Sequence, residues 1–394
     1  MRAKLHLIVL CIAMVAMLAA CGAEEKKADE KADVQTGEVA PAGDVAPAGK
    51  LVLGVAGAHS GDLASYGLPS VNAAKLVAAK MNAAGGVNGM QIEVVAQDDQ
   101  CKPELATNVA TKMVSDKVSI VLGHICSGAT KAAMPIYLES NIVVMSPSAT
   151  NPPLTQSGEY PNFFRTIAPD DAQAALEVSF AKGLGLRKLA VIHDKGDYGM
   201  GFATFCKEFI EADAEMEVVL FEGVTPGAVD YSAVVQKIRG SGADGVIFGG
   251  YHPEASKIVS GMRKRDLTIP FLSDDGVKDD TFIRVAGEFA EGVYATGPMD
   301  FSTNAIYQEA LAAHKAEFGS DPGPFFPEAY SAALALLTAV QNAGSTDYAK
   351  VVEALRTHYV DTAVGTIKFD AKGDAEGVGF AVYQVQDGKY VEIK

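Results

Sequence analysis

The sequence of 394 residues contains no tryptophan, only five cysteines, and fewer basic than acidic residues. The absence of tryptophan excludes intrinsic tryptophan fluorescence as a report on ligand binding. Five cysteines in a chain of this length exclude a small fold held together by disulfides. The 33 Lys and Arg against 49 Asp and Glu give a formal charge of −16. This balance argues against a nucleic-acid-binding protein, because such proteins need clustered basic side chains.

The apolar run near the N-terminus is too short to cross a membrane. Leu7–Ala20 has 14 residues, whereas a spanning helix needs about 20. The run follows Arg2 and Lys4 and ends in small residues directly before Cys21. This pattern is typical of a secretory signal, and the Cys after Leu-Ala-Ala resembles the lipid-modified Cys of bacterial lipoproteins. We therefore expect a signal peptide over residues 1–20 and lipidation of Cys21, which anchors the protein to a membrane.

The segment after Cys21 cannot form a core. It begins with a cluster of charges and continues with a tandem repeat, Gly37–Ala42 and Gly43–Ala48. Such a composition buries little apolar surface, so residues 21–49 are expected to form a disordered tether. The folded body is then residues 50–394, outside the cytoplasm, where disulfides persist. It holds 42 of the acidic and 28 of the basic residues, a net charge of −14.

The body alternates short apolar runs with helical stretches. We expect buried strands at 51–55, 92–95, 118–122, 142–145, 189–192, 218–221 and 245–248. We expect helices at 65–84, 103–116, 128–139, 171–183, 199–212, 231–239 and 254–265. Continuous apolar strands between helices of this length predict parallel sheets covered on both faces, in two α/β units that join near residues 167–172.

The last third of the chain has a different pattern. Three helices are expected at 305–318, 327–342 and 348–358, followed by strands near 366–369 and 380–393. Gln386–Lys389 predicts a hairpin turn, because its Gly accepts a positive φ. A helical tail after two α/β units could return to cover the first sheet, which would make the two lobes discontinuous in sequence.

The sequence has none of the common enzyme signatures. It contains no G-x-S-x-G, no G-x-x-x-x-G-K-[ST] and no H-E-x-x-H. His124 and Cys126 allow a nucleophile or a metal site, but in an exported protein Cys126 more simply pairs with another cysteine. Cys101 is the expected partner because it follows the neighbouring strand, and closing this loop of 25 residues would stabilise the fold by about 3–4 kcal/mol. Cys206 lies on an apolar helix face, which indicates a buried free thiol.

Hydroxyl groups and glycines gather where three strands end, at 58–61, 126–130 and 146–151. Ligands of doubly wound sheets bind at this edge, where helix N-termini attract carboxylates. Ser and Thr also cap ordinary helices, and taken one at a time each of these ends fits simple capping. Three such ends on one edge favour a binding cleft.

An ordered series of motifs resembles the leucine/isoleucine/valine-binding proteins, the extracytoplasmic substrate-binding components of ABC importers for branched-chain amino acids. The motifs extend over essentially all of residues 50–394, and they are Gly61–Gly67, Asn82–Gly89, Asp98–Cys101, Gly123–Ser127, Ser146–Pro152, Ile192–Gly199, Gly249–Glu254 and Phe369–Asp374.

The resemblance implies the type I periplasmic binding protein fold, with two doubly wound parallel-sheet lobes joined by a three-strand hinge. Lobe one would be residues 50–168 plus 299–372, and lobe two residues 169–298 plus 373–394. It also implies a Cys101–Cys126 disulfide and a monomer that is not an enzyme and uses no cofactor or metal.

The resemblance further implies eight ligand-binding residues. Ser127 and Thr150 match the hydroxyls that hold the amino acid's carboxylate and ammonium, and Ser148 matches a position that contributes its backbone. Tyr198 and Tyr251 match aromatic residues of the closing lobe. Tyr66 and Phe325 match the wall of the side-chain pocket.

The acid that meets the ammonium is Glu in well-known members of the family, and Asp275 is the match here. The neighbouring Asp274 takes this role if the alignment is off by one residue. Because Asp is one methylene shorter, its carboxylate is withdrawn by about 1.5 Å. Tighter lobe closure, a bridging water or a ligand that is larger near its amino group would compensate.

The resulting hypothesis is a lipid-anchored binding protein that captures a branched-chain aliphatic amino acid and delivers it to the permease subunits of an ABC importer. The alternatives are a binding component for another small amine or amide solute, or a sensor partner. An enzyme is disfavoured because no catalytic constellation is present.

Overall fold

The computed structural model describes residues 49–393, and these belong to one compact unit. The predicted signal peptide at 1–20, the lipidation of Cys21 and the tether at 21–49 lie outside the described residues, apart from Gly49. No helix among residues 49–393 is long and apolar enough to cross a membrane.

The first lobe contains a parallel sheet of five strands in the order β2-β1-β3-β4-β5. These strands are β1 (Lys50–Gly57), β2 (Gln91–Asp98), β3 (Ile120–Leu122), β4 (Val143–Ser146) and β5 (Phe163–Arg165). The helices that follow them along the chain are α1 (Ala64–Ala83), α2 (Pro103–Ser115), α3 (Ser127–Glu139) and the short α4 (Pro153–Gln156).

Both faces of this sheet are covered, as the continuous apolar runs predict. In β1, Leu51, Leu53 and Val55 contribute to one core cluster with residues of α1, whereas Val52 and Ala56 pack in the cluster with residues of α2 and α3. Successive side chains of a strand point to opposite faces, so a strand covered on both sides must be apolar throughout.

The second lobe contains a parallel sheet of four strands in the order β7-β6-β8-β9. These strands are β6 (Lys188–His193), β7 (Glu217–Gly223), β8 (Gly245–Gly249) and β9 (Phe271–Ser273). One face packs against residues of α5 (Asp170–Gly183) and α6 (Asp197–Ala212). The other face packs against α7 (Ser232–Ser241), α8 (His252–Arg263), α9 (Asp280–Ala286) and the 3₁₀ turn η1 (Gly287–Ala290).

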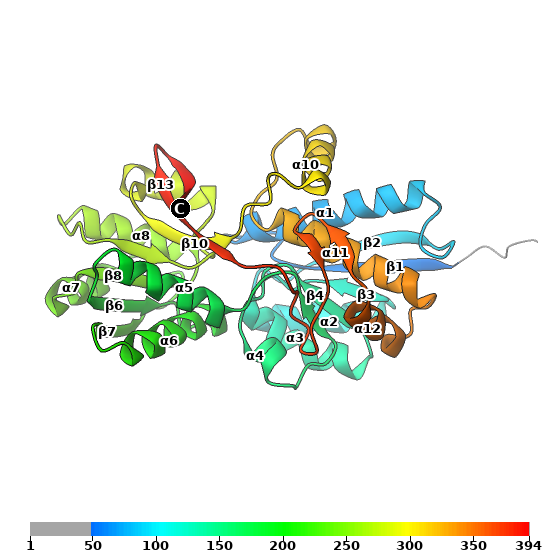
Figure 1. Cartoon of the computed structure of the whole chain (residues 1–394), viewed down its shortest axis with the longest axis horizontal. Coiled ribbons are helices and arrows are strands. Elements are labelled where there is room, and N and C mark those ends of the chain that lie inside the picture. Colours follow the sequence, from blue (N-terminus) through cyan, green and yellow to red (C-terminus); the bar gives the residue numbers. More distant parts are fainter. Residues whose placement is uncertain (1–48, 394) are drawn as a thin grey trace, which may run out of the picture. The chain divides into compact units, whose positions relative to one another are not determined.

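The helical tail returns to the first sheet. It consists of α10 (Ala305–Phe318), α11 (Phe326–Ala343) and α12 (Tyr348–Thr357), and residues of all three join the core cluster of α1. Figure 1 shows α11, drawn in orange, beside the blue α1. After α12 come β11 (Val360–Thr362) and β12 (Gly365–Ile367), which pair with each other.

The last strands belong with the second lobe. β13 (Phe380–Gln386) pairs with β10 (Tyr294–Pro298) and with β14 (Lys389–Ile393), and all pairs in this sheet are antiparallel. The hairpin turn predicted at Gln386–Lys389 is confirmed, since Asp387 and Gly388 both have positive φ, 52° and 71°. Figure 1 shows the red β13 beside the yellow β10, so segments distant in sequence share this sheet.

The chain therefore passes between the lobes three times, after β5, after β10 and after β12. The exact lobe boundaries, expected after residues 168, 298 and 372, stay predictions. The sequence pattern did not identify β5, β9, β10, β11, α4, α9 or η1. The two-lobe fold class with parallel sheets is confirmed.

Candidate functional site

The loops after β2 and β3 are joined by a disulfide between Cys101 and Cys126, whose Cα atoms lie 5.4 Å apart. The pairing expected from the sequence is confirmed, and Cys126 is therefore neither a nucleophile nor a thiolate ligand. His124 lies beside it as a buried structural residue, with Nδ1 2.5 Å from Asp99 and Nε2 3.0 Å from the Tyr137 hydroxyl. The disulfide fixes the loop from which helix α3 begins, and Cys206 is a buried free thiol as predicted.

No metal site is formed by the residues that the structure describes. Among residues 49–393 no group of three or more His, Cys, Asp or Glu side chains is arranged to hold a metal ion.

Ser127 is the first residue of α3 and is almost fully buried. Its hydroxyl accepts a hydrogen bond from the amide of Asn151 at 3.3 Å, which ties the start of the helix to the loop after β4. In that loop the Ser148 hydroxyl donates to the carbonyl of Ile125 at 2.8 Å. Thr150 differs, because its buried hydroxyl has no hydrogen-bond partner within residues 49–393.

Four predicted aromatic residues converge from four elements. Tyr66 lies on α1 and Phe325 directly precedes α11, and their ring centroids are 5.9 Å apart. Tyr198 lies on α6 and Tyr251 directly precedes α8, with 5.2 Å between their centroids. Tyr251 also lies 6.0 Å from Tyr66, so the aromatic rings of both lobes meet.

A pair of glycines lets the two tyrosines of the second lobe approach each other. Gly199 follows Tyr198, and Gly249 ends β8 just before Tyr251. A Cβ atom at either glycine would overlap the carbonyl oxygen of the other. Only residues without a side chain permit this close contact between α6 and the end of β8.

The backbone of Gly276 links the aromatic residues of the two lobes. The Tyr66 hydroxyl donates to the Gly276 carbonyl at 2.6 Å, and the Gly276 amide donates to the Tyr198 hydroxyl at 3.0 Å. The Tyr66 hydroxyl also lies 2.7 Å from Nδ1 of His252. Motif matching identified the tyrosines but neither Gly276 nor His252.

The two neighbouring acids after β9 have different surroundings. Asp275 accepts a hydrogen bond from the Tyr198 hydroxyl through Oδ1, while its buried Oδ2 has no partner within residues 49–393. Asp274 accepts through Oδ2 from the amide of Gly250 at 2.8 Å and so supports the turn before α8, while its buried Oδ1 likewise has no hydrogen-bond partner within residues 49–393. Burial raises the pKa of Asp275 to about 6, and it also raises the pKa of Asp274 well above its usual range.

A cavity of about 10 Å³, enough for about one water molecule, lies where these groups meet. Six of the eight predicted residues line it, namely Tyr66, Ser148, Tyr198, Tyr251, Asp275 and Phe325, together with Ile125 and Gly276. Ser127 and Thr150 do not line this cavity. The polar strand end at 58–61 does not contribute either, since its Ser60 is exposed and bonded to Asp98.

A larger cavity of about 350 Å³ adjoins the first and shares Asp275 and Phe325 with it. It is lined by aromatic and charged residues, including Lys278, Glu328 and Tyr383. The Lys278 ammonium lies 4.1 Å from the centre of the Tyr383 ring. Burial lowers the pKa of Lys278 and raises the pKa of Glu328 to about 7.

A further acid, Asp170, was not identified from the sequence. It is the first residue of α5, it is fully buried, and neither carboxyl oxygen has a hydrogen-bond partner in the described part of the chain. Burial, together with the charge of Asp275, raises the pKa of Asp170 to about 8. Asp170 directly precedes the helix predicted at 171–183, where an acid is an ordinary first-turn residue, so nothing in the sequence distinguishes it from a helix-capping acid.

Two parallel-sheet lobes with converging aromatic and acidic groups at their junction define a two-lobed α/β solute-binding protein. The periplasmic binding protein family matches residues 50–389, and the chain belongs to this family. The expectation of a binding protein rather than an enzyme is confirmed by its relatives.

Curated relatives and solved structures support this assignment over most of the chain. The Leu-, Ile-, Val-, Thr- and Ala-binding protein of Pseudomonas aeruginosa is 37% identical over 87% of this chain and 92% of its own length. The Leu/Ile/Val-binding protein of Escherichia coli strain K12 is 33% identical over 84% and 90%.

Two solved structures are similar at 25% and 26% identity. A leucine-binding protein from Thermotoga maritima has a TM-score of 0.80 and covers 87% of this chain and 98% of its own. A branched-chain amino acid transporter substrate-binding protein from Streptococcus pneumoniae, in complex with isoleucine, has a TM-score of 0.76 and covers 87% and 100%.

Proposed function

We propose that this protein binds a branched-chain aliphatic amino acid between its two lobes and delivers it to the permease of an ABC importer. The observation that carries the proposal is the convergence of six predicted binding residues around one cavity at the junction of the lobes. The names of the relatives, which bind leucine, isoleucine and valine, support the same class of ligand.

The chemistry of the site suits an α-amino acid. In the proposed complex, Asp275 Oδ2 meets the ammonium, since Oδ1 already accepts from Tyr198. The hydroxyls of Ser127 and Thr150 and the backbone of Ser148 hold the carboxylate and share the ammonium. Tyr66 and Phe325 provide the apolar wall for the side chain, and Tyr198 and Tyr251 cover the ligand from the second lobe. A buried charged head group must be paired, which explains the need for this polar set.

Binding also requires the lobes to move. A space of about 10 Å³ cannot admit leucine, so the contacts of Tyr66 with Gly276 and His252 must open before the ligand enters. In this proposal the lobes, 50–168 plus 299–372 and 169–298 plus 373–394, rotate about the three crossing segments and close again on the ligand. The N-terminal signal and a lipid on Cys21 would keep the protein outside the cytoplasm beside the permease.

A second candidate is a larger amine solute. Two observations favour it. The residue proposed to meet the ammonium, Asp275, is shorter than Glu, and a cavity of about 350 Å³ shares Phe325 and Asp275 with the small cavity. Movement of the Phe325 side chain would join the two cavities and extend the pocket.

Calorimetric and thermal-shift screening of the purified protein against the amino acids and small amines tests both candidates. We expect leucine, isoleucine and valine to bind and to raise the melting temperature, because a ligand at 100 times its Kd stabilises by about 2.7 kcal/mol. Two leucine analogues serve as matched controls: 4-methylpentanoate lacks the amino group and 3-methylbutylamine lacks the carboxylate. Neither should bind comparably. Failure of all aliphatic amino acids, with stabilisation by another solute, would refute the first candidate.

A further inference from the structure

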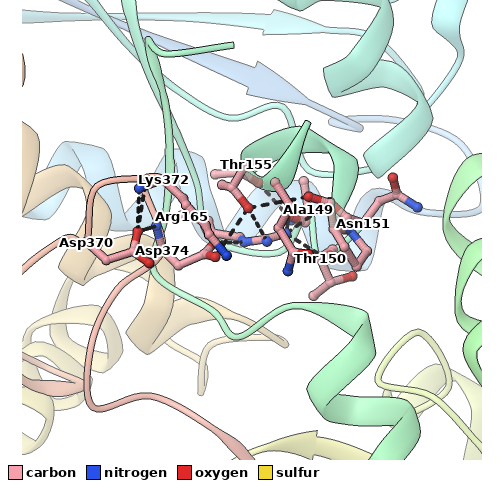
Figure 2. Close-up of polar contacts among 12 residues, drawn as sticks. Ala149, Thr150, Asn151, Thr155, Arg165, Asp370, Lys372 and Asp374 are labelled. Carbon is pink, nitrogen blue, oxygen red and sulfur yellow. Dashed lines mark hydrogen bonds and ion pairs between the residues drawn. The ribbon is translucent and has the colours of Figure 1, made fainter. Parts of the chain in front are cut away.

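A single buried guanidinium holds three successive carbonyl groups of the loop that contains Thr150. Arg165 ends β5 and is fully buried. Its Nη1 donates to the carbonyl oxygens of Ala149, Thr150 and Asn151 at 3.3, 2.7 and 3.1 Å. Figure 2 shows the three residues gathered around the end of the Arg165 side chain. Nη1 carries two N–H groups, so one of them is shared between two of the three carbonyl oxygens, and the longest contact, to Ala149, is the weakest.

The other side of Arg165 holds the last segment that crosses between the lobes. Nε donates to the carboxylate of Asp374 at 2.5 Å, and Nη2 donates to the Thr155 hydroxyl at 2.6 Å. The backbone is joined as well, since the Arg165 amide donates to Gly373 and the Ala375 amide donates to the Arg165 carbonyl, at 3.0 and 3.2 Å. Arg165 thus forms hydrogen bonds with the crossing segment at 373–375, and it directly precedes the first crossing segment, residues 166–169.

The turn that carries Asp374 is itself well fixed. One carboxylate oxygen of Asp370 accepts from the amides of Lys372, Gly373 and Asp374 at 2.8, 2.8 and 3.0 Å, as Figure 2 shows in part. Asp374 therefore presents its carboxylate to Arg165 from a rigid turn.

Thr150 is held by its backbone and not by its side chain. Its carbonyl oxygen accepts a hydrogen bond from Arg165 and another, at 3.0 Å, from the amide of Asp170. Asp170 is the first residue of α5, the helix that begins the second lobe. The Thr150 hydroxyl has no partner within residues 49–393. The hydroxyl faces the buried carboxyl group of Asp170, so Thr150 combines a fixed backbone with a side chain that a ligand head group could engage.

We propose that Arg165 and Asp374 form a latch that positions the Ala149–Asn151 loop for the ligand head group and couples it to the segments crossing between the lobes. Neither residue contacts the ligand, so both are positioning residues. The inference rests on the proposed function for the identity of the ligand, but not for the order of the loop.

The first test needs no ligand. Asp374→Asn removes the charge that orients the guanidinium while it keeps the shape of the side chain. In the ligand-free protein, we expect hydrogen exchange of the Ala149 and Asn151 amides to become at least about tenfold faster. The matched control is Asp244→Asn in the second lobe, where the Asp244 carboxylate accepts from the amides of Arg187 and Lys188. This variant should be less stable than the wild type, but hydrogen exchange of the Ala149 and Asn151 amides should not change.

The second test is a double-mutant cycle with leucine as the probe, at a temperature where circular dichroism shows every variant folded. Thr150→Ala and Asp374→Asn should each raise the Kd for leucine about tenfold. The Kd of the double variant should be no higher than that of the single variant with the higher Kd, because both substitutions remove the contribution of the Thr150 hydroxyl. Asp244→Asn should bind as the wild type does.

The outcomes separate the two proposals. If hydrogen exchange of the Ala149 and Asn151 amides is unchanged in Asp374→Asn, the latch is wrong whatever the ligand is. The latch is also wrong if the increase in Kd of the double variant equals the product of the increases in the two single variants. If the wild-type protein does not bind leucine, the proposed function fails, and the exchange measurement still decides whether the latch exists.

Discussion

At the scale of single residues, Asp275 is the acid that we propose meets the ligand's ammonium group. Its shorter side chain is met by Tyr198, whose hydroxyl donates to Oδ1 and is itself fixed by the amide of Gly276. The remaining oxygen, Oδ2, is buried without a partner in the described residues. The tyrosine therefore engages one carboxylate oxygen, and in the proposed complex the other oxygen meets the ligand's ammonium.

Replacing this charge gives a direct prediction. Asp275→Asn should weaken leucine binding about 10- to 100-fold, since hydrogen bonds to charged groups contribute about 1.5–3 kcal/mol. Isothermal titration calorimetry measures the change. Asp275→Glu should stay within a few-fold of the wild type. Asp274→Asn is the matched control, because Asp274 supports Gly250. A larger loss in Asp274→Asn than in Asp275→Asn would reverse the assignment of the two acids.

Motifs predicted eight ligand-binding residues, six of which line one cavity in the structure, but they did not point to Gly276, Asp170 or Arg165. The carbonyl and amide of Gly276 make backbone contacts, so no side-chain chemistry marks them in the sequence, and a Cβ atom there would overlap the carbonyl oxygen of Gly250. Asp170 has an unusual environment only because Thr150 and Asp275 are brought beside it by the fold. Likewise, the role of Arg165 depends on Asp374, which is 209 residues away in sequence.

At the scale of elements, the long strands and helices were predicted within a few residues, whereas several short ones were missed. β5 and β9 have three residues each, too few for any periodicity to be recognised. β10 pairs with β13, more than 80 residues later, and nothing local indicates this partner. Arg165 and the acids after β9 lie at the ends of these missed strands, which is why their surroundings could not be foreseen.

The disulfide next to helix α3 supports a prediction about stability. Replacing both Cys101 and Cys126 by Ser should lower the free energy of unfolding by about 3–4 kcal/mol, because the closed loop of 25 residues no longer restrains the unfolded chain. Urea denaturation followed by circular dichroism measures this. Reductant should cause a similar loss in the wild type and no further loss in the double variant. Equal stability of the oxidised wild type and the variant would contradict the prediction.

At the scale of the whole molecule, the lobes are joined by contacts that the proposed opening before ligand entry would break and the closing on the ligand would restore. Besides the bonds of Tyr66, the Lys131 ammonium lies 2.7 Å from Asp197, and the Asn151 amide group donates to the Asp197 carbonyl at 2.8 Å. Exposed ion pairs of this kind contribute about 0–1 kcal/mol, so the buried aromatic and acidic groups dominate the closed arrangement.

Those buried acids make stability depend on pH. Burial raises the pKa of Asp170 to about 8, of Glu328 to about 7, and of Asp275 and Asp194 to about 6. In the unfolded chain the same groups titrate near 4. Between these values the folded protein holds more protons than the unfolded chain, so the free energy of unfolding falls as pH rises.

We therefore expect the ligand-free protein to be most stable under mildly acidic conditions and to lose stability steadily from pH 5 to pH 8. Denaturation with urea at several pH values measures the slope. Asp170→Asn should flatten the slope, most of all between pH 6 and pH 8, because burial and the charge of Asp275 raise the pKa of the Asp170 carboxyl more than Thr150 and Arg165 lower it. Asp171→Asn is the matched control, since its carboxylate is partly exposed and accepts from Gln156. A slope that is the same in Asp170→Asn as in the wild type would mean that Asp170 is ionised in the folded protein, with its charge met by Arg165.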